Sequence, residues 1–181
     1  MFTLSGVVGP SPTTPSPSST PPPTTECPAD VIFVLDESGS IGTTNYDLMK
    51  MFLSRLVSRL DIDRGNTRVG LVTFSSDIGT SINLNAHSSV ASLQSAISSL
   101  SYAGDTTNTA AALEYVRTRM LTSAAGDRSD VPNVVVVLTD GGSGDTEATR
   151  VSNFAVKRFA CWLLILITCK IKKMIHLIEQ N

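Results

Sequence analysis

The most informative segment of the chain reads Val31-Ile-Phe-Val-Leu-Asp-Glu-Ser-Gly-Ser40. Its first half, from Val31 to Leu35, is an unbroken apolar run rich in β-branched residues, which is typical of a strand buried on both faces of a sheet. The run stops at Asp36, and oxygen-bearing side chains then follow at alternate positions. The segment therefore predicts a buried strand whose carboxyl end opens into a polar loop.

Strands and helices alternate downstream of this segment. Apolar residues at three- and four-residue spacings between Leu48 and Leu60 predict a helix, for which Thr44 or Asn45 is available as N-cap. Residues 78–84 alternate between apolar and polar, which indicates a strand at a sheet edge. Further strands are predicted over 69–75 and 134–138, and further helices over 90–100 (capped by Ser88 or Ser89), 109–121 and 145–155 (capped by Asp145). This order predicts an α/β fold with a doubly wound, mostly parallel sheet flanked by helices on both faces.

Two of the predicted buried strands are followed by an aspartate. Asp36 comes directly after the first strand, and Asp140 comes two residues after the strand at 134–138. In open parallel sheets, ligands bind beyond the carboxyl ends of the strands, at the point where the strand order reverses. We therefore expect the carboxylates of Asp36 and Asp140 to open onto the same crevice.

Hydroxyl groups accompany these two carboxylates. Ser38 and Ser40 lie in the loop after the first strand, and Thr107 lies in a hydroxyl-rich segment just before a predicted helix. All of these groups are hard oxygen donors, with no His or Cys among them, which favours magnesium, calcium or manganese over zinc or copper. The alternative is a plain strand-to-helix turn, in which Asp36, Ser38 and Ser40 satisfy only backbone amides.

Three motifs, in this order along the chain, resemble those of the von Willebrand factor type A domain. They are Asp36-x-Ser38-x-Ser40 after an apolar strand, the loop Thr107-Asn108-Thr109, and the strand end Leu138-Thr139-Asp140-Gly141. The resemblance runs from about Asp30 to Arg158 and implies a Rossmann-like fold. It also implies that these motifs form a metal-ion-dependent adhesion site.

The resemblance assigns a role to each residue of that site. It implies that Ser38, Ser40 and Thr107 ligate the ion directly, while Asp36 and Asp140 act mainly through water. The implied ion is Mg²⁺, with Mn²⁺ or Ca²⁺ as alternatives, and an acidic side chain of a protein partner is the remaining ligand. By the same resemblance, Glu37 and Thr109 are supporting residues rather than ligands.

The function predicted on this basis is metal-dependent protein binding in cell adhesion or the extracellular matrix. Collagen or another matrix protein is the implied class of partner. The alternatives are a structural or assembly module of a matrix protein with a vacant metal site, and a truncated fragment without function.

Other function classes lack their sequence signatures. An enzyme is not expected, because there is no Gly-x-Ser-x-Gly elbow and no Walker-type Gly-Lys-Ser/Thr, and because Ser38 stands where an aspartyl-phosphate enzyme needs a second Asp. An EF-hand loop needs Gly where the chain has Ile41 and Glu where it has Asp47. Nucleic-acid binding is disfavoured, because residues 26–156 carry 15 acidic against 9 basic residues, a net charge of −6.

The two ends of the chain differ from its middle, residues 29–158. Residues 1–28 form a predicted disordered linker in which every residue from Pro10 to Thr25 is Pro, Ser or Thr. Such a stalk indicates a secreted, extracellular protein, although residues 1–9 lack the basic start and apolar stretch of a signal peptide. Residues 159–181 form a tail that is first apolar and then basic.

The tail does not look like the continuation of the family pattern, so we expect a domain truncated at its C-terminus, without the last strand and helix. Its apolar run, 159–169, is shorter than the roughly 20 residues of a membrane helix and is better interpreted as a buried strand. The basic stretch after it suits a membrane surface, but an ordinary surface helix is the commoner case. The resemblance implies that Cys27 pairs beyond the final helix; here Cys161 or Cys169 would have to replace that partner, or Cys27 stays unpaired.

Overall fold

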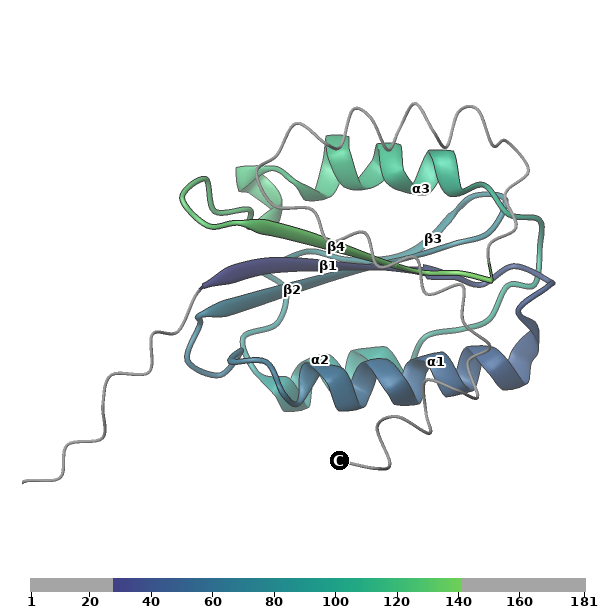
Figure 1. The fold of residues 1–181 in the computed structure, drawn as a ribbon, viewed down its shortest axis with the longest axis horizontal. Helices are drawn as coiled ribbons and strands as arrows, with labels where there is room; N and C mark the ends of the chain where they lie inside the picture. The colour runs from purple at the N-terminus through teal and green to yellow at the C-terminus, as the bar shows by residue number, and fades with distance from the viewer. Residues whose placement is uncertain (1–27, 141–181) are drawn as a thin grey trace, which may run out of the picture.

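The structure is a computed structural model in which residues 28–140 are described. Within this range the chain forms a four-stranded sheet with helices on both faces (Figure 1). The strands are β1 (Ala29–Asp36), β2 (Thr67–Phe74), β3 (Ile78–Ile82) and β4 (Asn133–Leu138). The helical elements are α1 (Gly42–Val57), α2 (Val90–Ser98), α3 (Thr109–Tyr115), the π-helical turn η1 (Val116–Met120) and the 3-10 turn η2 (Ser123–Ala125).

The order of the strands across the sheet is β3-β2-β1-β4. β1 runs parallel to both of its neighbours, β2 and β4, whereas β3 pairs antiparallel with β2 at the edge of the sheet. The predictions of a mostly parallel sheet and of an edge strand at 78–84 are therefore confirmed. The chain leaves β1 toward β2 and later returns to the other side of β1 as β4. The carboxyl ends of β1 and β4 consequently meet where the strand order reverses, the usual place for a ligand site.

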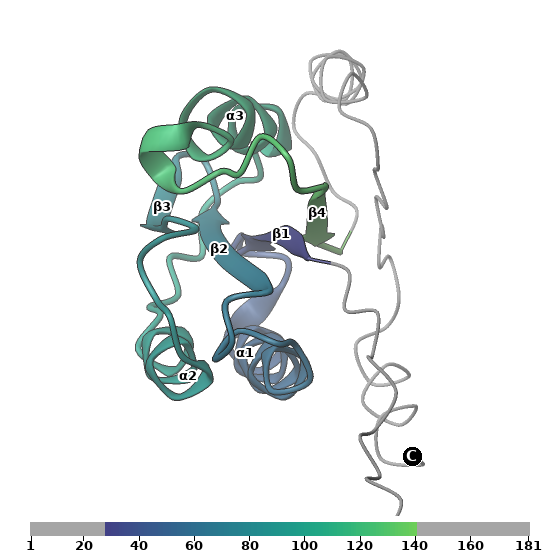
Figure 2. The same cartoon turned by 90° about the vertical axis from the view of Figure 1, so that its left-hand side faces the viewer.

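The core consists of two layers of buried side chains, one on each face of the sheet. Val31, Phe33 and Leu35 of β1 belong to the layer that packs against α1 and α2, and Ile32 and Val34 belong to the layer that packs against α3. Figure 2 shows these helices on opposite faces of the sheet. All five side chains are at most 8% exposed, as predicted for a strand buried on both faces. Each one buried in this way contributes about 1.5–3 kcal/mol to folding, so β1 is the centre of the fold.

The two helices beneath the sheet begin differently. α2 follows the prediction, because the side chain of Ser89 accepts a hydrogen bond from the backbone N–H of Ser92. The predicted cap of α1 by Thr44 or Asn45 is wrong: the helix begins at Gly42, and Ile41 precedes it without a side-chain cap. The loop after β1 already turns through a hydrogen bond from Ile41 N to Ser38 O, so the helix starts earlier.

The helix predicted over 109–121 is interrupted. After α3 the chain widens into the π-helical turn η1, where Leu121 N donates to Val116 O, five residues back. The hydroxyl of Thr118 donates to the carbonyl oxygen of Glu114 within the same segment. Side-chain bonds of this kind compete with the regular helical pattern, and apolar periodicity alone does not register them.

The amino end of the sheet is closed by one arginine. Arg128 forms an ion pair with the fully buried Asp30 of β1, at 2.7 Å, and donates its backbone N–H to the other oxygen of that carboxylate. Its guanidinium also donates to the carbonyl oxygens of Ala29, Gly65 and Asn66. This side chain therefore joins three segments of the chain at the start of β1.

Several predictions lie outside the described residues. They concern the linker before residue 28, the helix at 145–155, the tail at 159–181, the domain boundary at 158 and the three cysteines. Within residues 28–140, none of the helices has the length and apolar character needed to cross a membrane.

Candidate metal centre

Asp36, at the end of β1, is the buried carboxylate around which the centre is built. Its side chain is fully buried, with 0% exposure. One oxygen, Oδ1, accepts a hydrogen bond from Ser38 N at 2.9 Å, and Oδ2 accepts one from the hydroxyl of Thr139 at 2.7 Å. Thr139 follows β4, so this second bond joins the ends of the two adjacent strands. Both donors are uncharged, and no ion pair among residues 28–140 involves Asp36.

Two hydroxyl groups converge in the loop that follows Asp36. The Oγ atoms of Ser38 and Ser40 lie 3.2 Å apart, with Ser38 buried and Ser40 exposed. The turn closed by Ile41 N and Ser38 O brings them together. The plain-turn alternative accounts for the bond from Ser38 N to Asp36. It does not account for the two hydroxyls, which contact each other rather than a backbone amide.

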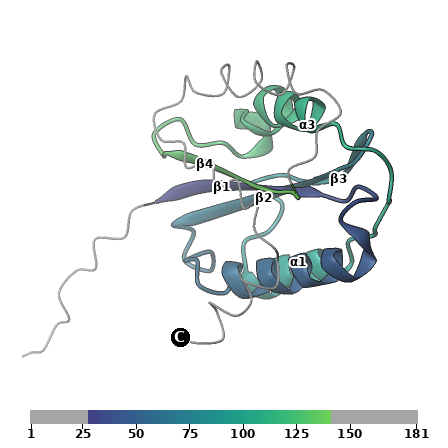
Figure 3. The same cartoon turned by 45° about the vertical axis from the view of Figure 1, so that its right-hand side comes forward.

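A second loop, residues 102–108, is fastened to this first loop by three hydrogen bonds. Tyr102 donates its hydroxyl to Ser38 O at 2.9 Å, Gly104 N donates to Glu37 O at 2.9 Å, and Gly39 N donates to Asp105 O at 2.7 Å. The approach is so close that a Cβ atom at Gly39 would lie 2.9 Å from the carbonyl oxygen of Gly104. Figure 3 shows both loops at the same end of the sheet, beyond β1.

Thr107 lies in this second loop, where Asn108 holds the chain on its other side. Asn108 N donates to Ser75 O at 2.8 Å, at the end of β2, and the Asn108 side chain caps α3 by accepting from Ala111 N. Thr107 is half-buried and makes no hydrogen bond to Asp36, Ser38 or Ser40 among the described residues. The segment that carries it is nevertheless anchored both to the loop after β1 and to the end of β2.

Asp140 is exposed and directly follows Thr139, whose hydroxyl contacts Asp36. The predicted residues are therefore arranged in two groups. Asp36, Ser38 and Ser40 lie within one short loop with direct contacts. Thr107 lies on the loop 102–108, which Tyr102, Gly104 and Asp105 attach to that short loop. Asp140 follows Thr139, whose hydroxyl attaches its segment to Asp36.

Glu37 is a second buried acid, and it points to a different part of the fold. It is 4% exposed, and it accepts hydrogen bonds from the hydroxyls of Tyr46 and Thr73. Burial raises the pKa of Glu37, those two hydrogen bonds partly offset the rise, and the nearby charge of Asp36 adds to it. A Cβ atom at Gly79 would collide with the carboxylate of Glu37, so the β2–β3 hairpin has no room for a side chain at this position. Through these hydrogen bonds Glu37 links the loop after β1 to α1 and β2.

Sequence reasoning missed two residues of this region. Tyr102 fastens the two loops together, and nothing in the local pattern marks its distant contact with Ser38. The sequence places Thr139 in a strand-end motif without indicating a role for it, whereas in the structure its hydroxyl joins β4 to Asp36. Its position between Leu138 and Asp140, at the end of a buried strand, is the signal that could have identified it.

The donor set fits a hard divalent cation. Every candidate ligand offers oxygen, and the carboxylate of Asp36 is buried without a cationic partner among residues 28–140. Residues 28–140 contain no group of three or more His, Cys, Asp or Glu side chains that could hold a metal ion by themselves. A cation at this centre would therefore depend on the Ser and Thr hydroxyls, which is chemistry suited to Mg²⁺, Mn²⁺ or Ca²⁺.

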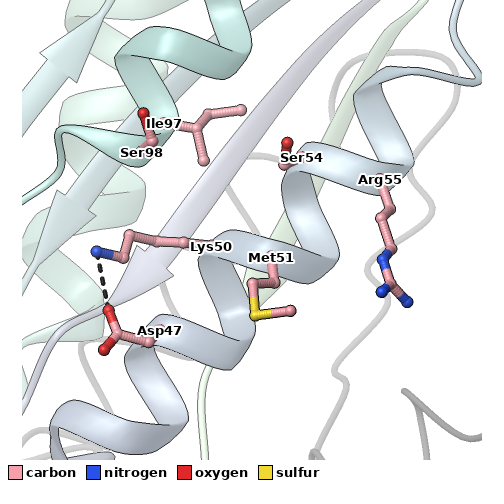
Figure 4. A pocket seen from close by; sticks show the side chains of 7 residues that line it. All are labelled: Asp47, Lys50, Met51, Ser54, Arg55, Ile97 and Ser98. Carbon is pink, nitrogen blue, oxygen red and sulfur yellow. Dashed lines mark ion pairs between the residues drawn. The ribbon is translucent and has the colours of Figure 1, made fainter.

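A groove between α1 and α2 is separate from this centre. It has a volume of about 470 Å³, and none of the five candidate ligands lines it. Figure 4 shows its lining residues, with Lys50 paired to Asp47 at one end and Met51 and Arg55 on the outer face of α1. Lys50 also donates to Leu100 O, so its charge is already used within the fold.

Solved structures with a similar fold include a matrix protein from mussel byssus. Proximal thread matrix protein 1 superposes with a TM-score of 0.68 and 27% sequence identity, covering 72% of this chain and 35% of that one. A second structure of the same protein, with a TM-score of 0.67, 26% identity and the same shares of each chain, has a zinc-occupied metal-ion-dependent adhesion site.

Relatives by sequence include collagen chains and matrilins. The mouse collagen alpha-4(VI) chain is 39% identical over 120 residues, which are 65% of this chain and 5% of that protein. Mouse matrilin-1 is 37% identical over 122 residues, which are 66% of this chain and 24% of that protein. The chain thus spans a small part of the length of these relatives. The family model of the von Willebrand factor type A domain matches residues 30–161, and the chain belongs to that family.

Proposed function

We propose that this chain is a divalent-metal-dependent protein-binding module of the extracellular matrix. Asp36, Ser38, Ser40, Thr107 and Asp140 would hold the cation. The observation that carries the proposal is the fully buried carboxylate of Asp36, which has only uncharged donors around it and two converging hydroxyls beside it. Burying an ionised carboxylate without a compensating charge is costly, and a bound cation would remove that cost.

The residues of the centre would have two different roles in binding the cation. The hydroxyl oxygens of Ser38, Ser40 and Thr107 would be direct ligands, and Asp36 and Asp140 would act mainly through bound water. The hydrogen bonds from Ser38 N and Thr139 fix the Asp36 carboxylate, one to each oxygen, so that it does not rotate when the cation binds. Mg²⁺ is the first choice, Mn²⁺ and Ca²⁺ are alternatives, and the zinc in the byssus protein adds a fourth cation to test.

The cation would also explain how an acidic domain binds an acidic side chain. Residues 28–140 carry 12 acidic against 8 basic residues, a net charge of −4, and Asp36, Glu37 and Asp140 lie at or beside the centre. Without a cation this surface repels a carboxylate. The bound ion supplies the positive charge that attracts it, so that the partner's Asp or Glu completes the coordination shell.

The partner we propose is a matrix protein such as collagen, and the module is proposed to be secreted. The support comes from the collagen and matrilin relatives and from the byssus matrix protein. A catalytic role is not proposed. Among residues 28–140 the single histidine, His87, lines a different cavity.

The test is a titration of the full chain with Mg²⁺, Mn²⁺, Ca²⁺ and Zn²⁺, read out by thermal denaturation and by binding to immobilised collagen. A cation at 100 times its Kd is expected to stabilise the fold by about 2.7 kcal/mol. Asp36→Ala and Asp140→Ala are expected to abolish both the stabilisation and the metal-dependent binding. Asp130→Ala, which removes an exposed acid beyond the other end of the sheet, is the matched control.

Two outcomes would count against the proposal. Stabilisation by none of the four cations would favour the structural module with a vacant site. Stabilisation that is the same in the Asp36→Ala variant and in the parent chain would move the cation to another place.

A further inference from the structure

A cavity lies at the end of the sheet opposite the candidate metal centre. The parallel strands begin at this end, on the left in Figure 1. It has a volume of about 360 Å³, within the range of about 300–1,000 Å³ typical of small-molecule sites. The loop after α1, the first residues of β2 and the loop before α2 enclose it. Its polar and charged lining residues are Asp63, Arg64, Thr67, Arg68, Asn85, His87 and Ser88.

Most N–H groups of the Arg68 guanidinium make no hydrogen bond among the described residues. A guanidinium carries five N–H groups, and Arg68 uses one of them, from Nη1 to the carbonyl oxygen of Gly126 at 2.7 Å. No acid pairs with Arg68 among residues 28–140, and its side chain is only half exposed. Its position in β2 holds it in place, so an incoming anion would meet a positioned guanidinium rather than a mobile surface chain.

The acid in the cavity is already engaged. Asp63 accepts a hydrogen bond through Oδ1 from Val90 N, at the amino end of α2, at a distance of 2.9 Å. The positive end of a helix offsets part of the charge of such a carboxylate. Asp63 is the acid among the lining residues and its carboxylate is bound at α2, whereas Arg68 brings a positive charge that pairs with no acid among residues 28–140.

The donors around the cavity come from separate segments. Arg68 belongs to β2, and His87 and Ser88 belong to the loop before α2. A carboxylate offers two oxygens in one plane. A tetrahedral oxyanion offers three or four oxygens in different directions, and it suits donors that approach from several sides.

We propose that this cavity binds a sulfate or phosphate ester carried by a small polar molecule such as a sugar. Arg68 is the principal contact, and His87 and Ser88 contribute further donors. The site is independent of the metal centre, because it lies at the other end of the sheet and shares no residue with it.

The test uses the full ¹⁵N-labelled chain with Mg²⁺ present. The probes are inorganic sulfate, inorganic phosphate, glucosamine 6-sulfate, glucose 6-phosphate and, as a planar anion, acetate. We expect saturable shifts of the amides at 63–68 and 85–88 with the two esters, with a Kd of about 1 mM. The ester that binds more tightly identifies the source of the oxyanion, and acetate is expected to bind at least about 5-fold more weakly.

Three variants assign the binding to the cavity. Arg68→Gln is expected to weaken ester binding by about 10-fold. Arg55→Gln, which removes the exposed arginine of the α1–α2 groove, is expected to change nothing (Figure 4). Because Arg68→Gln also loses the bond to Gly126, His87→Gln serves as a second variant that breaks no bond of the fold among the described residues. It is expected to weaken binding by about 3-fold.

Two results would overturn the proposal. One is the absence of a saturable shift with any oxyanion up to about 50 mM. The other is an equal loss of binding in Arg55→Gln and Arg68→Gln, which would show general charge attraction instead of a site. Neither result touches the metal titration, so the two proposals fail separately.

Discussion

Two aspartates of the same strand, Asp30 and Asp36, have the same burial and opposite surroundings. Both lie in β1 with 0% exposure. Asp30, at the amino end, meets the guanidinium and the backbone N–H of Arg128, so its charge is neutralised inside the fold. Asp36, at the carboxyl end, receives only the N–H of Ser38 and the hydroxyl of Thr139. Two equally buried acids thus differ in their surroundings: the charge of Asp30 is compensated by Arg128, and we propose that the charge of Asp36 is compensated by a bound cation.

The largest effect on stability is expected when the ion pair between Arg128 and Asp30, at the amino end of β1, is removed. Arg128→Ala leaves the buried carboxylate of Asp30 without a charged partner and with only the backbone N–H of residue 128 as donor, and removing one partner of a buried ion pair costs about 3–5 kcal/mol. Urea denaturation of the metal-free chain measures this loss. Arg117→Ala, which breaks an exposed pair with Glu114, is the matched control and is expected to change stability little. Equal effects of the two variants would refute the structural role of Arg128.

Asp36, at the carboxyl end of β1, is expected to respond to substitution in the opposite way. Asp36→Asn removes a buried charge that nothing in the described fold compensates, so the metal-free chain should lose less than about 1.5 kcal/mol. The same variant should lose the metal-linked stabilisation of about 2.7 kcal/mol at 100 times Kd. Asp30→Asn is the counterpart: it should destabilise the metal-free chain and keep the metal-linked part. Denaturation with and without Mg²⁺ separates the two terms.

A smaller effect is expected at the joint between the two loops of the metal centre. Tyr102→Phe keeps the ring and removes the hydroxyl that donates to Ser38 O. One such hydrogen bond is worth about 1 kcal/mol, which corresponds to a metal affinity about 5-fold weaker if the loops shift apart. Tyr115→Phe, on a half-buried ring of α3, is the control. Isothermal titration with Mg²⁺ would show whether only the first variant weakens binding.

The smallest effect concerns Glu37 and pH. Because burial raises the pKa of Glu37 above its ordinary value of 4.5, its ionised form destabilises the fold at neutral pH. Stability from this group is fully present below pH 4.5 and is lost as pH rises through the folded-state pKa. Glu37→Gln should therefore be relatively more stable at pH 7 than at pH 4, in metal-free denaturation curves. A difference between variant and parent that stays constant with pH would contradict this.

Local patterns in the sequence predicted most of the fold and the meeting of two chain segments at the candidate centre. The apolar run from Val31 to Leu35 predicts a strand buried on both faces because β-branched side chains fill both layers of the core. The strand-end positions of Asp36 and Asp140 predict that two chain segments far apart in sequence meet. Ser89 was predictable as the N-cap of α2 because its side chain bonds a backbone N–H only three residues further along the chain.

The remainder depends on contacts that no local pattern records. The pairing of Asp30 with Arg128 spans 98 residues, and the bond from Tyr102 to Ser38 spans 64. The start of α1 was misplaced because a turn hydrogen bond, not a polar cap, begins that helix. The widening after α3 was missed because a threonine hydroxyl bonds the backbone there. In each case tertiary or side-chain bonding overrides the local preference.

The backbone hydrogen bonds that join the two loops also allow the candidate metal centre to be monitored. The amide protons of Gly39 and Gly104 are donated across the joint, to Asp105 O and Glu37 O. A donated amide exchanges with solvent deuterium only when its bond opens. The exchange rates of these two glycines therefore measure how often the loops separate. A ligand that tightens the centre would slow both of them together, without any label being placed on the protein.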